Sequence, residues 1–116
     1  MNQIREVMAP TLQQIEAAIR ELDGETRNLL TLGTGSVAHM GIGGGPSSYI
    51  VYATFDNDTF HNLIVPSAEG VTRLVAGGQE SEYPARLCVG IRQALAAART
   101  FGAFGTLDPA LSWETQ

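Results

Sequence analysis

The sequence predicts an α+β domain, in which an antiparallel sheet of about five strands is flanked by an N-terminal and a C-terminal helix. Three observations support this fold class. Apolar residues repeat at helical spacing near both ends, short β-branched runs lie between them, and turn residues separate those runs. Strands that are grouped together, with helices outside the group, favour α+β over a doubly wound parallel sheet. We assign the whole chain, residues 1–116, to one domain.

The first helix is predicted within residues 9–25. Thr11 and Gln14 have the spacing of a capping box, in which each side chain bonds the backbone N–H of the other residue. Apolar residues then follow at intervals of three and four and form one stripe. They are Leu12, Ile15, Ile19 and Leu22. Gly24 is expected to end the helix as a left-handed cap.

Five candidate strands follow, each rich in β-branched, aromatic or other apolar residues. They are the runs RNLLTLG (27–33), SVAHMGI (36–42), SSYIVYATF (47–55), FHNLIV (60–65) and VTRLVAG (71–77). Their starts are about 9 to 13 residues apart, with a turn signal each time. This spacing predicts an antiparallel meander.

The remaining residues predict a loop, a second helix and a tail. Residues 77–86, GGQESEYPAR, form a polar segment that we expect to be a loop. Residues 89–105 form the second helix, with Ile91, Leu95 and Ala98 on one stripe. The tail, residues 106–116, carries Trp113, whose large ring we assign to the core.

The glycine-rich run from Gly41 to Pro46 suggests either a phosphate-binding loop or a tight corner between strands. In a dinucleotide fingerprint a third glycine would replace Pro46, and a helix would follow instead of the strong strand candidate found here. A P-loop requires a lysine, and the chain has none. We therefore predict a hairpin corner, in which the glycines permit positive φ and Pro46 fixes the exit.

The composition excludes several classes of partner and location. The net charge is −5, and an acidic chain is poorly suited to binding nucleic acid, where phosphate neutralisation supplies much of the affinity. The single cysteine, Cys88, excludes an internal disulfide. No apolar run has the length of a signal peptide core or a membrane span. We expect a cytoplasmic protein that binds neither nucleic acid nor membranes.

Residues that could carry chemistry are few. His39 and His61 lie in predicted strands without other ligands at zinc-site spacing, and no nucleophile elbow is present. A Ser-His-Asp arrangement assembled in space stays open. Asp56 and Asp58 flank Asn57, but the glycine and glutamate of an EF-hand loop are missing. We expect no catalytic residue, no metal and no cofactor.

The polar segment 77–86 has two interpretations. Glu80 and Glu82 could give charge-directed specificity to a contact surface, and Tyr83 could add contact area at low entropic cost. Alternatively, the segment is an ordinary surface loop whose Tyr83 folds back on the core. The sequence alone favours neither.

One ordered set of residues resembles the Imm1 family of bacterial immunity proteins. Its members are Gly78, Glu82, Pro84, Phe101, Gly105, Pro109, Trp113 and Glu114. The resemblance spans about residues 28–114. It implies a non-enzymatic α+β protein, encoded beside a polymorphic toxin that is often of the deaminase type, which protects the producing cell by binding that toxin. The lysine-free, alanine- and arginine-rich composition is typical of a high-GC actinobacterial gene.

We therefore expect an immunity protein that binds and neutralises a cognate protein toxin. An acidic inhibitor can occupy the basic cleft of a toxin that acts on nucleic acid. The expected contact residues are Glu80, Glu82, Tyr83, Asp56, Asp58 and Glu114. The alternatives are an actinobacterial interaction or regulatory module without a toxin, either monomer or homodimer, and a small hydrolase or transferase.

Overall fold

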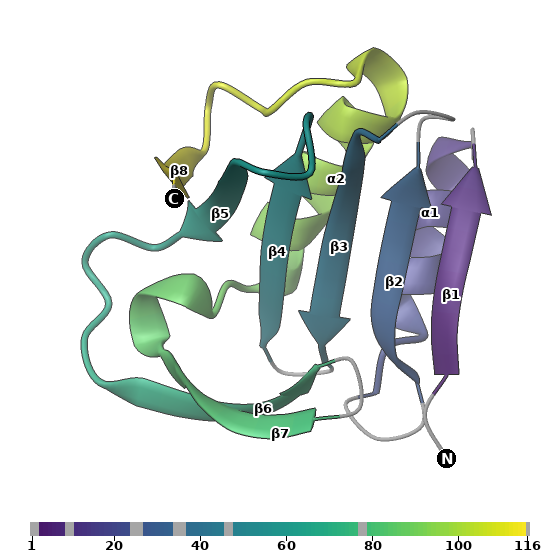
Figure 1. The fold of residues 1–116 in the computed structure, drawn as a ribbon. Coiled ribbons are helices and arrows are strands. Elements are labelled where there is room, and N and C mark those ends of the chain that lie inside the picture. The colour runs from purple at the N-terminus through teal and green to yellow at the C-terminus, as the bar shows by residue number, and fades with distance from the viewer. Residues whose placement is uncertain are drawn as a thin grey trace.

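The computed structural model describes residues 3–8, 11–23, 27–33, 37–45, 48–76 and 79–115. A six-stranded sheet has the order β1-β2-β3-β4-β5-β8, and a separate ribbon pairs β6 with β7 (Figure 1). The sheet strands are β1 (Gln3–Met8), β2 (Arg27–Gly33), β3 (His39–Gly44), β4 (Tyr49–Thr54), β5 (Phe60–Ile64) and β8 (Ser112–Thr115). The other elements are β6 (Val71–Ala76), β7 (Gln79–Pro84), α1 (Leu12–Arg20), α2 (Ile91–Phe104) and the short 3-10 helix η1 (Ala85–Leu87).

The predicted α+β fold class is confirmed, but the strands of the main sheet are not the five strands of the predicted meander. The antiparallel strands are β2, β3, β4, β5 and β8, while β1 adds to the edge by parallel pairing with β2. The predicted fifth strand, β6, leaves this sheet and pairs with β7. A period-two pattern predicts that a segment is a strand but not which strand becomes its partner.

The first helix begins as predicted. The Thr11 hydroxyl accepts the backbone N–H of Gln14 at 3.1 Å, and the Gln14 side-chain carbonyl accepts the N–H of Thr11 at 2.9 Å. These two bonds satisfy donors that the first turn of a helix would otherwise leave open. The stripe faces the core, since Ile15, Ile19 and Leu22 are buried. The predicted cap Gly24 lies outside the described residues.

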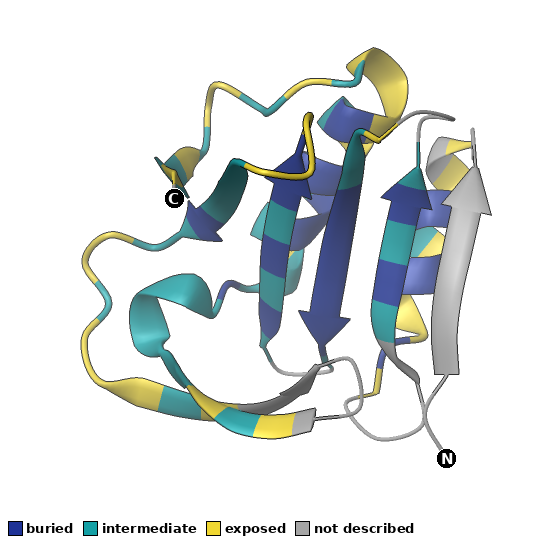
Figure 2. Cartoon of the chain, in the orientation of Figure 1, coloured by how far each residue is buried: buried dark blue, intermediate teal, exposed yellow. Residues whose placement is uncertain are grey.

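Both α-helices cover the same face of the sheet (Figure 1). Figure 2 shows the buried residues concentrated in β2, β3, β4 and the helices. Small residues, Ala94, Ala97 and Ala98, are completely or almost completely buried in α2. They allow the helix to approach the strands closely, because their side chains add little thickness between the layers. The hydrophobic core therefore lies between the helices and this face of the sheet.

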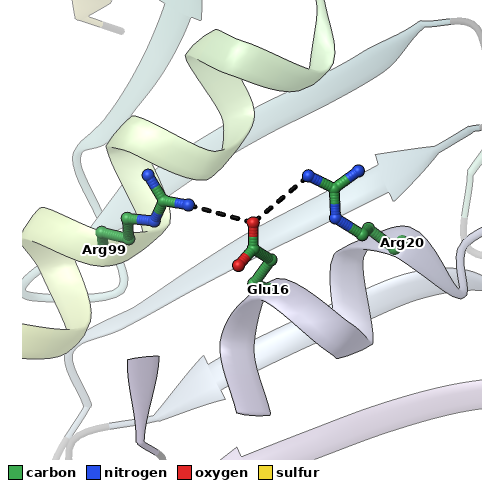
Figure 3. A network of polar contacts seen from close by, with 3 residues as sticks. All are labelled: Glu16, Arg20 and Arg99. Carbon is green, nitrogen blue, oxygen red and sulfur yellow. Dashed lines mark hydrogen bonds and ion pairs between the residues drawn. The ribbon is translucent and has the colours of Figure 1, made fainter. Parts of the chain in front are cut away.

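A glutamate carboxylate links α1 to α2. Glu16 of α1 accepts hydrogen bonds from Arg20 at 3.2 Å and from Arg99 of α2 at 3.1 Å, all through one oxygen (Figure 3). The three side chains are partly exposed. Such pairs are worth little individually in water. They place the charges of Arg20 and Arg99 beside the helices.

The glycine-rich run forms the predicted hairpin corner between β3 and β4, but the corner is shorter than expected, because β3 continues to Gly44. Gly41, Gly43 and Gly44 belong to β3, and the turn is closed by the N–H of Gly45, which donates to the carbonyl of Ser48 at 2.7 Å. Only Gly44 and Gly45 in this run have positive φ, 93° and 87°. Pro46 lies outside the described residues. A different requirement explains Gly41: a Cβ there would overlap the ring of Tyr52 on the neighbouring strand.

The tail packs back on the domain. Trp113 is half-buried against the core, as predicted, and its indole N–H donates to the carbonyl of Asp108 at 3.1 Å. This places β8 beside β5, with Trp113 opposite Leu63 in the register. None of the helices in the described ranges is long and apolar enough to cross a membrane.

Candidate protein-binding face

The side of strands β2 to β5 that lies opposite α1 and α2 is called the outer face below. Successive side chains of a strand point to opposite sides of a sheet. In β4, the buried Val51 and Ala53 therefore face the helices, whereas Ile50 and Tyr52 face outward and are half-buried. The register places His39, Asn62 and Phe60 on the same outer side.

Three rings form an edge-to-face cluster on the outer face. The centroids of His39 and Tyr52 lie 5.7 Å apart with an interplanar angle of 89°, and those of Tyr52 and Phe60 lie 5.9 Å apart at 76°. Aromatic pairs prefer this geometry. Together with Asn57 and Asn62, the rings line an open hollow of about 390 Å³. A smaller hollow lies beside it.

The second hollow, of about 90 Å³, lies next to the first and shares Tyr52 and Asn62 with it. Tyr83 of β7 and Leu87 of η1 form its other wall. Tyr83 is half-buried and lines this hollow together with residues of β4 and β5. The two hollows form one surface that extends from the β4–β5 loop to β7.

The predicted polar loop is β7, which corrects that assignment. Glu80 and Glu82 lie on one side of the ribbon and Tyr83 on the other, because side chains alternate along a strand. Glu80 forms an ion pair with Arg73 at 2.9 Å, and Arg73 lies opposite Glu82 in the register. Cross-strand pairing with β6 explains why a polar segment becomes a strand.

Asp56 stabilises the loop between β4 and β5. Its carboxylate accepts the backbone N–H groups of Asp58 at 2.9 Å and Thr59 at 2.8 Å. The hydrogen bond from the backbone N–H of Thr59 has the largest effect on the pKa of Asp56, followed by that of Asp58, and both lower it. The Asp56 carboxylate is therefore an anion at neutral pH. Thr54, which is buried, accepts the N–H of Asn57 at 3.0 Å. Asn57 has φ of 60°, in the left-handed region that asparagine tolerates.

Glu114 of β8 forms a bidentate ion pair with Arg86 of η1, with both N–O distances 3.0 Å. The Arg86 guanidinium lowers the pKa of Glu114 and its own pKa is raised, as expected for a charged pair. The pair joins η1 to the edge strand of the sheet. Glu114 also lies opposite Asn62 in the register, so it is next to the outer face.

The six predicted contact residues do not form one cluster. The ribbon that carries Glu80, Glu82 and Tyr83 and the loop that carries Asp56 and Asp58 lie at opposite ends of the sheet (Figure 1). Glu114 lies at the β8 edge. The outer face extends between these positions.

Sequence reasoning missed the aromatic cluster of the outer face. The alternation in YIVYAT indicates that Ile50 and Tyr52 share one side of a strand, but it does not indicate which side the helices cover. The two histidines lie on opposite sides: His39 on the outer face, and His61, opposite Ala53, on the helix side. Within the described ranges, no group of three or more His, Cys, Asp or Glu side chains could hold a metal ion.

The fold and the outer face define a class of protein, a small α+β domain that presents an aromatic surface between acidic segments. A comparison with protein families matches residues 3–115 to Immunity protein Imm1. The match covers nearly the whole chain, and the protein therefore belongs to the Imm1 family. A comparison with curated proteins found no match.

Residues of the Imm1-like set mostly hold the structure together. Phe101 is buried in the core, and Gly105 ends α2 with φ of 68° in the left-handed region. Trp113 and Glu114 attach β8 through the contacts described above. Glu82 is exposed on β7, and Gly78 lies outside the described residues. The set therefore identifies the fold more directly than it identifies a contact surface.

Proposed function

We propose that this protein neutralises a cognate protein toxin in the cell that produces both, by non-covalent binding. Membership of the Imm1 family is the observation that supports this function. The net charge of −5 is consistent with a toxin that acts on nucleic acid, since such a toxin needs a basic cleft. A deaminase-type toxin domain fits this description.

The outer face is the proposed docking surface. It offers half-buried aromatic side chains, which are the residues that most often dominate protein interfaces. A partner that covers it would reach the β4–β5 loop with Asp56 and Asp58 at one end and β7 with Tyr83 at the other. Glu80 and Glu82, on the opposite side of the ribbon, would contact a toxin that wraps around β7. Glu114 is proposed as a contact at the β8 edge.

Co-expression tests this function directly. The probe is the toxin domain encoded at the end of the nearest gene for a large secreted protein, expressed with and without this chain. We expect the chain to restore cell survival and to co-purify with the toxin domain. Killing that continues in the presence of the folded chain, without a complex, would contradict the proposal. A stable homodimer found by gel filtration in that case would favour the interaction module instead.

Neutralising the two glutamates of β7 tests their proposed role. We expect the double variant Glu80→Gln with Glu82→Gln to bind the toxin domain at least about tenfold more weakly, because it removes charges that complement a basic cleft. Calorimetric titration gives the dissociation constant. The matched control is Gln13→Arg with Ala17→Arg, which changes the net charge by the same amount on exposed positions of α1.

The control variant is expected to keep the wild-type affinity. Equal weakening in both double variants would show that net charge, and not β7, determines binding. Wild-type affinity in the glutamine variant would remove Glu80 and Glu82 from the contact surface. The lost ion pair with Arg73 is exposed, so the fold itself should change in stability by about 1 kcal/mol at most.

A further inference from the structure

We propose that the 390 Å³ hollow on the outer face receives an arginine side chain of the toxin. The inference rests on the proposed function and specifies the chemistry of its docking surface. Three properties of the hollow support it: the aromatic walls, the hydrogen-bond acceptors and the charge of the adjacent loop.

The walls suit a planar cation. The rings of His39, Tyr52 and Phe60 lie edge to face, so their planes are steeply inclined to one another. A guanidinium that enters the hollow can lie against a ring face while its edge remains free for hydrogen bonds. The same rings would also accept an apolar side chain, and the polar groups of the hollow decide between the two.

Those polar groups include several acceptors. The Nδ1 of His39 lies 2.9 Å from the carbonyl oxygen of Val37. Since a carbonyl only accepts, Nδ1 is the donor of this bond, and in the tautomer that makes it Nε2 is the acceptor. Asn57 and Asn62 also line the hollow, and each side-chain amide has a carbonyl oxygen that can accept a hydrogen bond. A guanidinium has five N–H donors, whereas an apolar side chain would leave these acceptors without partners.

The adjacent charge is negative. Asn57 lines the hollow, and the carboxylates of Asp56 and Asp58 flank it in the chain. Arg86 lies near the β8 edge of this face, but its charge is paired with that of Glu114. Arg20 and Arg99 are on the helices, where both pair with Glu16 (Figure 3). A positive ligand is therefore attracted to the hollow, whereas the phosphate of a nucleotide would be repelled. Arginine satisfies the ring faces, the acceptors and the charge together.

A titration without the toxin tests the hollow itself. The probe is Nα-acetyl-arginine N-methylamide, and the control is the citrulline analogue, which has nearly the same shape without the charge. Two-dimensional ¹⁵N–¹H NMR should show saturable shifts at the amides of His39, Tyr52, Asn57, Phe60 and Asn62 with the arginine probe, and smaller ones with citrulline. Equal responses to both, or shifts located elsewhere, would overturn the inference.

Two variants test the hollow in the complex. Asn62→Arg places a like charge at the hollow, at a strand position of β5, and Gln13→Arg adds the same charge on α1 as its control. Phe60→Leu removes one ring but keeps apolar bulk, and Phe104→Leu does the same at an exposed position of α2. We expect Asn62→Arg to weaken toxin binding at least about 100-fold, and Phe60→Leu by about 2- to 30-fold, the range of a cation–π contact.

The controls should bind like the wild-type chain, and all four variants should retain its circular dichroism spectrum. Wild-type affinity in both hollow variants, together with toxin binding by the wild-type chain, would overturn the arginine site while the proposed function stands. A wild-type chain that fails to bind the toxin domain would instead contradict the function, and the NMR titration would still decide whether the hollow recognises arginine.

Discussion

Gly41 and Tyr52 show how a single residue shapes the outer face. The Tyr52 ring lies directly over Gly41 of the neighbouring strand, where a Cβ would overlap it. Glycine weakens a strand, so its presence here is explained by this close approach. Because Gly41 has no side chain, the Tyr52 ring can lie across it and contact the rings of both His39 and Phe60.

Replacing Gly41 by alanine should displace this ring. We expect Gly41→Ala to lower the free energy of unfolding by about 1–3 kcal/mol, the usual cost of overpacking, measured by urea denaturation. In a Tyr52→Leu background the same change should cost much less, because the overlapping ring is gone. Equal costs in both backgrounds would show that the ring is not the reason for the glycine.

The ion pair between Glu114 and Arg86 gives the stability of the protein a defined pH dependence. Arg86 holds the pKa of Glu114 below its ordinary value of 4.5 in the folded state. A carboxylate with a lowered folded pKa stabilises the fold above its unfolded pKa and loses that contribution as the pH falls through the folded pKa. The pair therefore stabilises the protein at neutral pH and not in acid.

Glu114→Gln should reveal this contribution. The variant should have a lower free energy of unfolding than the wild-type chain at pH 7, and the difference should shrink as the pH falls below 4.5. Urea denaturation at a series of pH values measures the difference. A difference in the free energy of unfolding that stays constant below pH 4.5 would show that the charge of Glu114 does not stabilise the attachment of β8.

At the scale of elements, α2 ends at a glycine for a local reason. Gly105 has φ of 68° and its N–H donates to the carbonyl of Phe101 at 2.8 Å, while a Cβ would meet no neighbouring atom. The cost of a substitution is therefore that of the backbone conformation alone. Gly105→Ala should lower the free energy of unfolding by about 1–2 kcal/mol.

The asparagine variant is the matched control for this position. Asn tolerates the left-handed region better than Ala, so Gly105→Asn should cost less in the same urea denaturation experiment. An alanine variant as stable as the wild-type chain would contradict the assigned role of the cap.

Both α-helices and five of the eight strands in the described ranges could be predicted from the sequence, since each has a strong local signal. The capping box of Thr11 and Gln14 and the apolar stripes define the helices. The strands β1, β7 and β8 were missed. The polar segment of β7 forms a strand by pairing with β6, and the four residues of β8 by pairing with β5. Such pairing depends on tertiary contacts that no local pattern encodes.

At the scale of the whole molecule, the site was harder to predict than the fold. The acidic residues of β7 and the β4–β5 loop are visible in the sequence, but their separation at opposite ends of the sheet is not. The outer face depends on which side of the sheet the helices cover. That choice follows from packing of the core, so the cluster of His39, Tyr52 and Phe60 could be found only in the structure.

Hydroxyl-radical footprinting of the complex with the toxin domain tests the central claim most directly, because it reports the exposure of individual side chains. Docking on the outer face predicts that oxidation of Tyr52, Phe60 and Tyr83 falls when the complex forms. Phe104, which is 76% exposed on α2, should react at the same rate as in the free chain. Protection of Phe104, with Tyr52, Phe60 and Tyr83 reacting as in the free protein, would contradict the account.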